Sequence, residues 1–197
     1  METSTNTLKW AILLIASHPD IQTRVRAEIE ANIGLERLPG YDDRHLLPYT
    51  EAVINEVYRF SSVTPLALPH KALQDTHIGE YFIPAGTIVL PNQWAVHHQP
   101  DIWPDPHHFN PDANFTRRLE DGSLASARTE YLVPFGMGKR LYPGDAFARQ
   151  QFFLVFVGVL QRFRIAAHPS HSLPSEDECI SGLVRASLPY KVCFMSN

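Results

Sequence analysis

Residues 135–144, Phe-Gly-Met-Gly-Lys-Arg-Leu-Tyr-Pro-Gly, are the most informative segment of the sequence, and a long apolar pattern follows them directly. Gly138 and Gly144 permit close approach of the backbone and positive φ angles. The start of the following helix offers free amide hydrogens and the positive end of its dipole. Arg140 adds a charge that can hold a carboxylate through two bonds. By its chemistry alone the segment is either a plain loop leading into a helix or a cradle for an anionic or flat ligand.

Hydrophobic periodicity predicts helices on both sides of this loop. The predicted helices cover about residues 8–15, 19–33, 49–60 and 145–163. Pro19 suits the first position of the second helix, whose four-residue apolar steps indicate a surface amphipathic helix. The last helix is apolar on most sides, so we expect it to lie centrally in the core. Its apolar residues are Phe147, Phe152, Phe153, Val155, Phe156, Val159 and Leu160.

The middle of the chain is rich in proline and predicts turns and short strands. We expect strands over residues 76–83 and 86–90, with a turn at 84–86 between them. Residues 92–114 show no sustained period and predict a structured meander with short helical turns. The tail, residues 180–194, predicts two short strands around Leu188 and Pro189.

Composition excludes several classes of protein. The chain has 197 residues and a formal net charge of -4, which argues against a dedicated nucleic-acid binder. Its 2 cysteines are too few for a disulfide scaffold and lack metal-ligand spacing, so a reducing compartment is expected. No apolar run approaches the roughly 20 residues that cross a bilayer, and no signal peptide follows Met1. We expect this chain alone to be soluble and cytosolic unless a membrane-directing part is missing.

Four residues of the opening segment give it a family resemblance. Phe135, Gly138, Arg140 and Gly144 fill four of the five fixed positions of Phe-x-x-Gly-x-Arg-x-Cys-x-Gly. This pattern is the heme-binding loop of the cytochrome P-450 family, which the segment resembles. Further family motifs appear in the expected order along essentially the whole chain, and the resemblance is closest to animal microsomal, family 2-like members.

The first 70 residues of the chain carry three of these motifs. Glu56 and Arg59 match the Glu-x-x-Arg of the family's K helix and can share a salt bridge, although alone such a pair usually indicates a surface ion pair. Glu2 and Thr3 resemble the end of an Ala-Gly-x-Glu-Thr stretch in the I helix, which implies positions in a proton relay. His70 resembles the histidine that lies beside a heme propionate.

The meander keeps the family's spacing at Trp103, Pro106, Phe109 and Pro111. Two residues after the last proline, where the family has an arginine, this chain has Ala113. We therefore expect the family's Glu-Arg-Arg network to be incomplete.

The resemblance implies a mainly α fold with small β-sheets, the C-terminal part of the cytochrome P-450 fold. That part runs from the end of the I helix through the J and K helices, meander, heme loop and L helix to a terminal β-hairpin. Residues 1–197 would form one partial domain whose N-terminal part is missing. In this frame Arg140 and His70 would hold heme propionates, Phe135 would lie under the heme loop, and Glu56 and Arg59 would brace the core.

The family's activity is heme-dependent monooxygenation. One atom of O₂ enters a small lipophilic substrate, with electrons from a flavoprotein reductase at the cytosolic face of the endoplasmic reticulum membrane. Lys139, Arg128, Arg117 and Arg118 could form a basic face for such a reductase, or could be ordinary solvated charge. Of the 10 histidines only His70 is assigned a site role, because the adjacent pairs cannot easily point at one metal ion.

Tyr142 stands at the fifth fixed position of the heme loop, where the family has its cysteine ligand to iron. A thiolate ligand pushes electron density onto iron and favours O–O cleavage. A tyrosine can ligate as phenolate, but its free pKa of about 10 would require help from Arg140 and the helix dipole. Cys179 has acidic neighbours that disfavour a thiolate, and Cys193 indicates a core position in the tail, so neither substitutes.

Three interpretations of Tyr142 stay open: loss of the ligand by mutation or sequence error, a ligandless pseudo-enzyme with a retained role, and a working tyrosine ligand. We expect that the chain does not perform the family reaction. The alternatives are a non-catalytic or reductase-binding decoy protein and a gene fragment without a function of its own.

Overall fold

The computed structural model describes residues 2–121 and 123–196. Its α-helices are α1 Glu2–Ser17, α2 Pro19–Asn32, α3 Pro48–Ser61, α4 Gln93–His97, α5 Pro111–Phe115 and α6 Asp145–Arg162, with short 3-10 segments η1 Tyr41–Leu46, η2 Thr129–Tyr131 and η3 Gly138–Arg140. Its strands are β1 His70–Lys71, β2 Thr76–Ile78, β3 Tyr81–Ile83, β4 Ile88–Val89, β5 Thr116–Arg118, β6 Leu124–Ser126, β7 Phe163–Ala167, β8 Cys179–Ile180, β9 Ala186–Ser187 and β10 Val192–Ser196.

The four long predicted helices are confirmed, and local chemistry sets their ends. Pro19 and Pro48 occupy the first turns of α2 and α3, where a missing N–H costs nothing. Gly34 follows α2 at φ 78°, and its N–H reaches back to carbonyls of the last turn. Ser62 ends α3 in the left-handed region at φ 37°.

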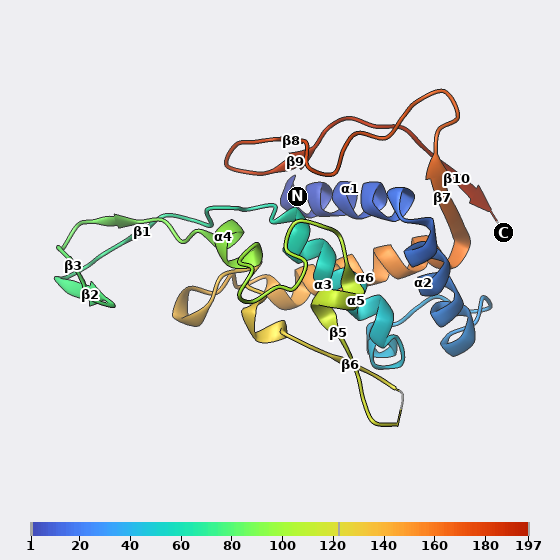
Figure 1. Ribbon diagram of the computed structural model, residues 1–197, viewed down its shortest axis with the longest axis horizontal. Coiled ribbons are helices and arrows are strands. Elements are labelled where there is room, and N and C mark those ends of the chain that lie inside the picture. Colours follow the sequence, from blue (N-terminus) through green and yellow to red (C-terminus); the bar gives the residue numbers. More distant parts are fainter. Residues whose placement is uncertain (1, 122, 197) are drawn as a thin grey trace.

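The core lies where α1, α3 and α6 meet, and Figure 1 shows α3 running from beneath α1 across α6. Trp10 of α1 contacts Phe60 of α3 edge to face, with ring centroids 6.5 Å apart. On α6 the residues that turn inward are Phe152, Phe153, Phe156 and Leu160. The predicted central position of α6 holds for these residues and is wrong for Phe147 and Val155, which are 70% and 40% exposed.

Five separate antiparallel pairs make up the β-structure of the described chain. The predicted strand over residues 76–83 is instead a hairpin, since Gly79 at φ 59° turns the chain between β2 and β3. The next strand, β4, pairs with β1. The two short strands predicted around Leu188 and Pro189 are confirmed as β9 and β10; β9 pairs with β8, and β10 pairs with β7.

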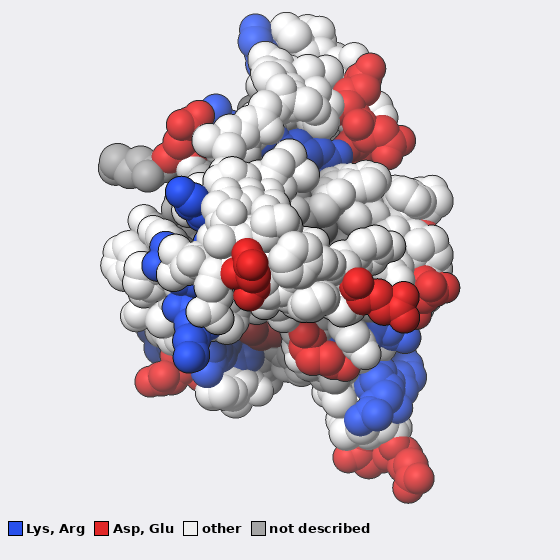
Figure 2. Space-filling view, turned by 90° about the vertical axis from the view of Figure 1, so that its left-hand side faces the viewer, with Lys and Arg blue, Asp and Glu red and all other residues white. Residues whose placement is uncertain are grey.

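The pairs β1–β4 and β2–β3 form an arm that extends from the helical body to the left in Figure 1. Figure 2 views the molecule from that side and shows blue and red groups interspersed around a largely uncharged centre. Within residues 2–121 and 123–196, no helix is long and apolar enough to cross a membrane.

The charged pair Glu56 and Arg59 lies inside this body, with both side chains 0% exposed. Arg59 Nε donates to Glu56 Oε2 at 2.6 Å, and its Nη2 donates to Oε1 at 2.7 Å. The predicted ion pair is confirmed, whereas a surface location is wrong. Two buried bonds in this fork geometry are much stronger than one exposed contact.

The same pair holds the meander to α3. Arg59 Nη1 donates to the carbonyls of His97 at 2.7 Å and Pro106 at 2.8 Å. Glu56 Oε1 accepts from the amide N–H of Asn110 at 2.9 Å and from the Asn114 side chain at 3.0 Å. Asn110 and Asn114 thus donate hydrogen bonds to the Glu56 carboxylate, which therefore has partners although residue 113 is alanine and not arginine. The expected gap in the network is therefore filled by neighbouring residues of the meander.

Replacing Arg59 by methionine should destabilise the fold strongly. Arg59→Met leaves Glu56 buried without its counter-ion and frees the meander carbonyls, so we expect a loss of about 3–5 kcal/mol in the free energy of unfolding, measured by urea denaturation. The control is Arg24→Met, since Arg24 pairs with Asp112 at the surface and both are 46% exposed. We expect that variant to lose less than about 1 kcal/mol. Equal losses in the two variants would contradict the role of the buried pair.

Candidate functional site

The loop of residues 135–144 is closed by backbone bonds. Tyr142 N donates to Phe135 O at 2.9 Å, and Leu141 N donates to Gly138 O at 3.1 Å. Gly136 at φ 82° and Gly138 at φ 66° take the left-handed conformations that this path requires. The loop ends at the first residue of α6, whose N–H bonds to Tyr142 O at 3.1 Å.

Gly144 has a different role from the predicted one, because its φ is -90° and not positive. A Cβ atom at this position would lie 2.6 Å from Cε1 of Tyr142 and 3.0 Å from its hydroxyl oxygen. The missing side chain therefore makes room for the tyrosine ring.

Phe135 joins the loop to the helices. Its ring lies parallel to that of Tyr142, with centroids 6.3 Å apart and an interplanar angle of 18°. On α3, Tyr58 meets Phe135 edge to face at 5.5 Å. On α6, the guanidinium of Arg149 lies 4.9 Å from the Phe135 centroid, and its Nε donates to Asp145 at 2.7 Å. Contacts from α3 and α6 thus fix the base of the loop at Phe135.

Tyr142 itself is 54% exposed. Its backbone groups are used within the loop, but its phenol makes no hydrogen bond to any part of the chain that the structure describes. Arg140 is exposed in η3, and within residues 2–121 and 123–196 it forms no ion pair. The expected assistance of Arg140 to a phenolate is therefore not seen in this arrangement.

The remaining predicted site residues lie on other elements. His70 is exposed on β1, opposite Val89. Figure 1 shows this arm and the loop before α6 at the same end of the molecule. Glu2 and Thr3 are exposed in the first turn of α1, where the Thr3 carbonyl accepts a bond from Thr7 at 2.9 Å. The structure brings Glu56 and Arg59 together, whereas it shows no contact between His70 and Arg140 among the described residues.

Sequence reasoning missed His97, which is 1% exposed on α4. Val133 N, two residues before Phe135, donates to His97 Nε2 at 3.0 Å. Because Nε2 accepts, the proton lies on Nδ1, which donates to Ser62 Oγ at 2.8 Å. Gln93 donates to the Val133 carbonyl at 2.7 Å, so both backbone groups of Val133 are held by α4.

Burial, helped by the charges of His98 and Arg59, lowers the pKa of His97 to about 3. The ring therefore stays neutral and links α3 to the chain that enters the loop. The signal in the sequence was the spacing of Gln93 and His97, which places two polar side chains on one helix face.

The two cysteines lie outside the loop, on β8 and β10. Burial acts to raise the pKa of the Cys179 thiol, but hydrogen bonds from Ser181 and Arg185 outweigh it and lower that pKa. The predicted disfavoured thiolate is thus wrong, because Arg185 Nε at 3.2 Å counts for more than the acidic neighbours. Cys193 is half-buried. Within residues 2–121 and 123–196, no group of three or more His, Cys, Asp or Glu side chains could hold a metal ion.

Comparison with known proteins identifies the family and the fold. The profile described as Cytochrome P450 matches residues 1–194. The chain belongs to the cytochrome P450 family. It is 42% identical over 174 residues to Cytochrome P450 2U1 of Bos taurus, covering 88% of this chain and 31% of the relative. It is 38% identical to Steroid 17-alpha-hydroxylase/17,20 lyase of Squalus acanthias, covering 98% of this chain and 37% of the relative.

Solved cytochrome P450 structures share the architecture. A zebra fish cytochrome P450 with progesterone superposes with a TM-score of 0.88 at 38% identity, covering 98% of this chain and 43% of that one. A zebra fish structure with abiraterone gives a TM-score of 0.87 at 37% identity, covering 100% and 44%. The fold of the C-terminal part of a cytochrome P450 and the resemblance to animal microsomal members are confirmed. The chain spans about a third of the length of the curated relatives.

The family implies a heme, and the loop fits it only in part. Phe135, Gly138, Arg140 and Gly144 match the family's sequence pattern, but Tyr142, at the position of the family's cysteine, cannot supply a thiolate. Tyr142 supplies an oxygen atom on a half-exposed phenol whose ring lies against Gly144. We therefore derive no reaction step from a heme in this chain.

Acid should destabilise the fold partly through His97. Its pKa is about 3 in the fold and about 6.5 in the unfolded chain, so the unfolded state takes up a proton that the fold excludes. The stability contribution is present above pH 6.5 and is lost as the pH falls towards 3. We expect the free energy of unfolding to fall by up to about 1.4 kcal/mol per pH unit from this residue.

Urea denaturation between pH 7 and pH 4 measures this slope. His97→Gln should reduce the slope, while His45→Gln, on an exposed residue of η1, should keep that of the wild type. An unchanged slope in His97→Gln would show that the histidine is not held neutral.

Proposed function

We propose that this chain is the heme-binding C-terminal part of a cytochrome P450 and that it does not carry out thiolate-dependent monooxygenation. The family reaction inserts one atom of O₂ into a small lipophilic molecule with electrons from a flavoprotein reductase. The observation that supports this proposal is Tyr142, because the other four fixed positions of the family's heme-loop pattern are present. The relatives support a lipophilic substrate class, since one is named a steroid 17-alpha-hydroxylase and the zebra fish structures contain progesterone and abiraterone.

The other site residues take the roles that the family pattern gives them. Arg140 and His70, both exposed, would neutralise heme propionates, and Phe135 would support the loop from α3 and α6. Gly138 would set the loop's turn, and Gly144 would leave space at the start of α6. Glu56 and Arg59 would brace the meander, and Glu2 and Thr3 would occupy the proton-relay positions.

When bound, heme supplies the redox-active iron at which the family activates O₂. A thiolate makes that iron competent for O–O cleavage, and a neutral phenol does not. In the described chain no cationic side chain is bonded to the Tyr142 hydroxyl, so no described group stabilises a phenolate. Loss of the ligand is therefore the favoured interpretation of Tyr142.

The carbonyl spectrum of the reduced protein tests this proposal. We expect no strongly red-shifted band with carbon monoxide for the chain, or for a chimera in which it replaces the matching part of a full-length 17-alpha-hydroxylase relative. Tyr142→Cys in the chimera should create the band, because it supplies the thiolate to an otherwise intact loop.

The matched control is Tyr131→Cys, which places a thiol at a residue of η2 that is 45% exposed. That variant should show no such band. A red-shifted band in the unmodified chimera would overturn the loss of thiolate ligation, and a Tyr142→Cys chimera without the band would overturn the assignment of the loop.

A non-catalytic reductase-binding protein is the second candidate function. Lys139 and Arg140 are exposed on η3 and make no ion pair in the described chain. Arg117 and Arg118 are exposed on β5, whereas Arg128 donates to the carbonyls of Ala113 and Asn114. An acidic flavoprotein reductase would meet the free charges at the surface of the endoplasmic reticulum, where the microsomal relatives reside.

Capture of purified reductase on the immobilised chain measures this interaction. We expect Lys139→Glu combined with Arg140→Glu to reduce capture by at least tenfold at low salt, because two attractions become repulsions. The control reverses Arg162 and Arg164, which are exposed at the far end of α6 and on β7. Equal losses in both double variants would indicate unspecific charge attraction and contradict a docking site at the loop.

A further inference from the structure

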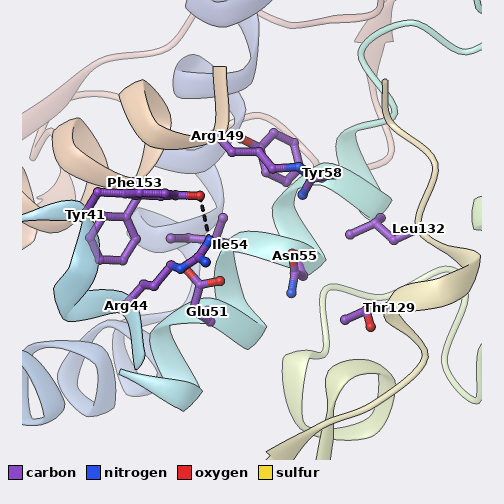
Figure 3. Close-up of a pocket in the computed structure, with 10 residues that line it drawn as sticks. All are labelled: Tyr41, Arg44, Glu51, Ile54, Asn55, Tyr58, Thr129, Leu132, Arg149 and Phe153. Carbon is purple, nitrogen blue, oxygen red and sulfur yellow. Dashed lines mark hydrogen bonds between the residues drawn. The ribbon is translucent and has the colours of Figure 1, made fainter. Parts of the chain in front are cut away.

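A pocket of about 300 Å³ lies beside the loop, between η1, α3, the segment around η2, and α6 (Figure 3). Side chains from all four elements line it, and Figure 3 shows them around a common space. Neither the axial position nor the exposed basic residues of η3 belong to its lining. The pocket is thus separate from the proposed heme site.

The hydroxyl of Tyr58 is the first feature of this pocket that indicates a bound ligand. The residue is 6% exposed, and its buried hydroxyl has no hydrogen-bond partner in the described part of the chain. A buried hydroxyl without a partner is unfavourable unless something outside the protein accepts its proton. Burial also raises the pKa of Tyr58, so the hydroxyl stays a donor at neutral pH.

Two guanidiniums line the same pocket. Arg44 donates through Nη1 to the Tyr41 hydroxyl at 2.7 Å and lies over that ring at 4.6 Å (Figure 3). Arg149 uses Nε to bind Asp145, which lies outside the lining. Each guanidinium keeps N–H donors that no described residue accepts. Such donors suit a carboxylate, which takes two bonds from one guanidinium.

The charges and the apolar residues of the lining indicate which class of ligand the pocket would bind. Glu51 is the lining carboxylate, and burial raises its pKa while Arg44 and Arg149 oppose that change. The two guanidiniums outnumber it, so the lining favours an anion over a cation. Ile54, Leu132 and Phe153 contribute apolar groups to the wall. A ligand that satisfies both features carries one anionic group on an apolar body.

We propose that this pocket binds a small organic carboxylate with an apolar body. The carboxylate pairs with Arg44 and Arg149 and accepts the proton of the Tyr58 hydroxyl, while the body lies against the apolar wall. This site is independent of heme and of the identity of residue 142, so it goes beyond the proposed function.

Calorimetric titration of the chain with benzoate tests the site. Benzoate should bind at least tenfold more tightly than benzamide, which lacks the charge, and than acetate, which lacks the apolar body. Inorganic phosphate should also bind more weakly than benzoate, because it has no group for the apolar wall. Phosphate binding more tightly than benzoate would overturn the carboxylate assignment.

Variants separate binding from folding. Tyr58→Phe removes a hydroxyl without a protein partner, so affinity for benzoate should fall about tenfold while the stability to urea does not decrease. Arg44→Gln should weaken binding at least tenfold, and Glu51→Gln should tighten it several-fold by removing the opposing charge. Arg162→Gln, on an exposed arginine of α6 outside the pocket, is the control and should leave affinity unchanged.

The conservative variants decide the outcome even if Arg44→Gln fails to fold. Unchanged affinity in Tyr58→Phe, or no tightening in Glu51→Gln, would overturn the proposed contacts. Benzoate that binds no better than benzamide would overturn the site itself.

Discussion

The buried pair of Glu56 and Arg59 is the interaction on which the rest of the molecule depends. Both side chains are fully buried on one face of α3, and Arg59 donates two short hydrogen bonds to Glu56. Their remaining donors and acceptors bind the backbone of the meander. Buried charges of this kind are tolerated only when every donor and acceptor is used. The meander supplies those partners, including the asparagines at 110 and 114, and in return its irregular backbone is fixed. A loop-rich segment thereby acquires one conformation.

The meander in turn positions the segment that leads into the candidate site. His97 and Gln93 of α4 hold Val133, and Phe135 follows two residues later between Tyr58 and Arg149. The loop is therefore held from the core outward, and the ring of Tyr142 stacks on that of Phe135.

The helices were predictable because their signals are local. Apolar residues at helical spacing, proline in the first turn and glycine after the last one identify α2 without knowledge of its neighbours. The pairing of the short strands was not predictable, because β1 pairs with β4 and β7 with β10 across segments whose partners the sequence pattern does not name. The exposure of Phe147 was also misjudged, since an apolar side chain indicates burial only when another element covers it. The same limit applies to Cys179, whose thiol is governed by Arg185 across a turn rather than by its acidic neighbours.

Residue identity at fixed spacing predicted the family, the order of the helices and the Glu56–Arg59 pair, and it puts a tyrosine where the family pattern has cysteine. The tertiary structure added that the pair is buried, that Asn110 and Asn114 complete it, and that His97 holds the approach to the loop. It also brought Arg44, Tyr58 and Arg149 to one pocket from three elements. The physical reason is that burial and hydrogen-bond satisfaction belong to groups that meet in space, and spacing along the chain does not encode those meetings.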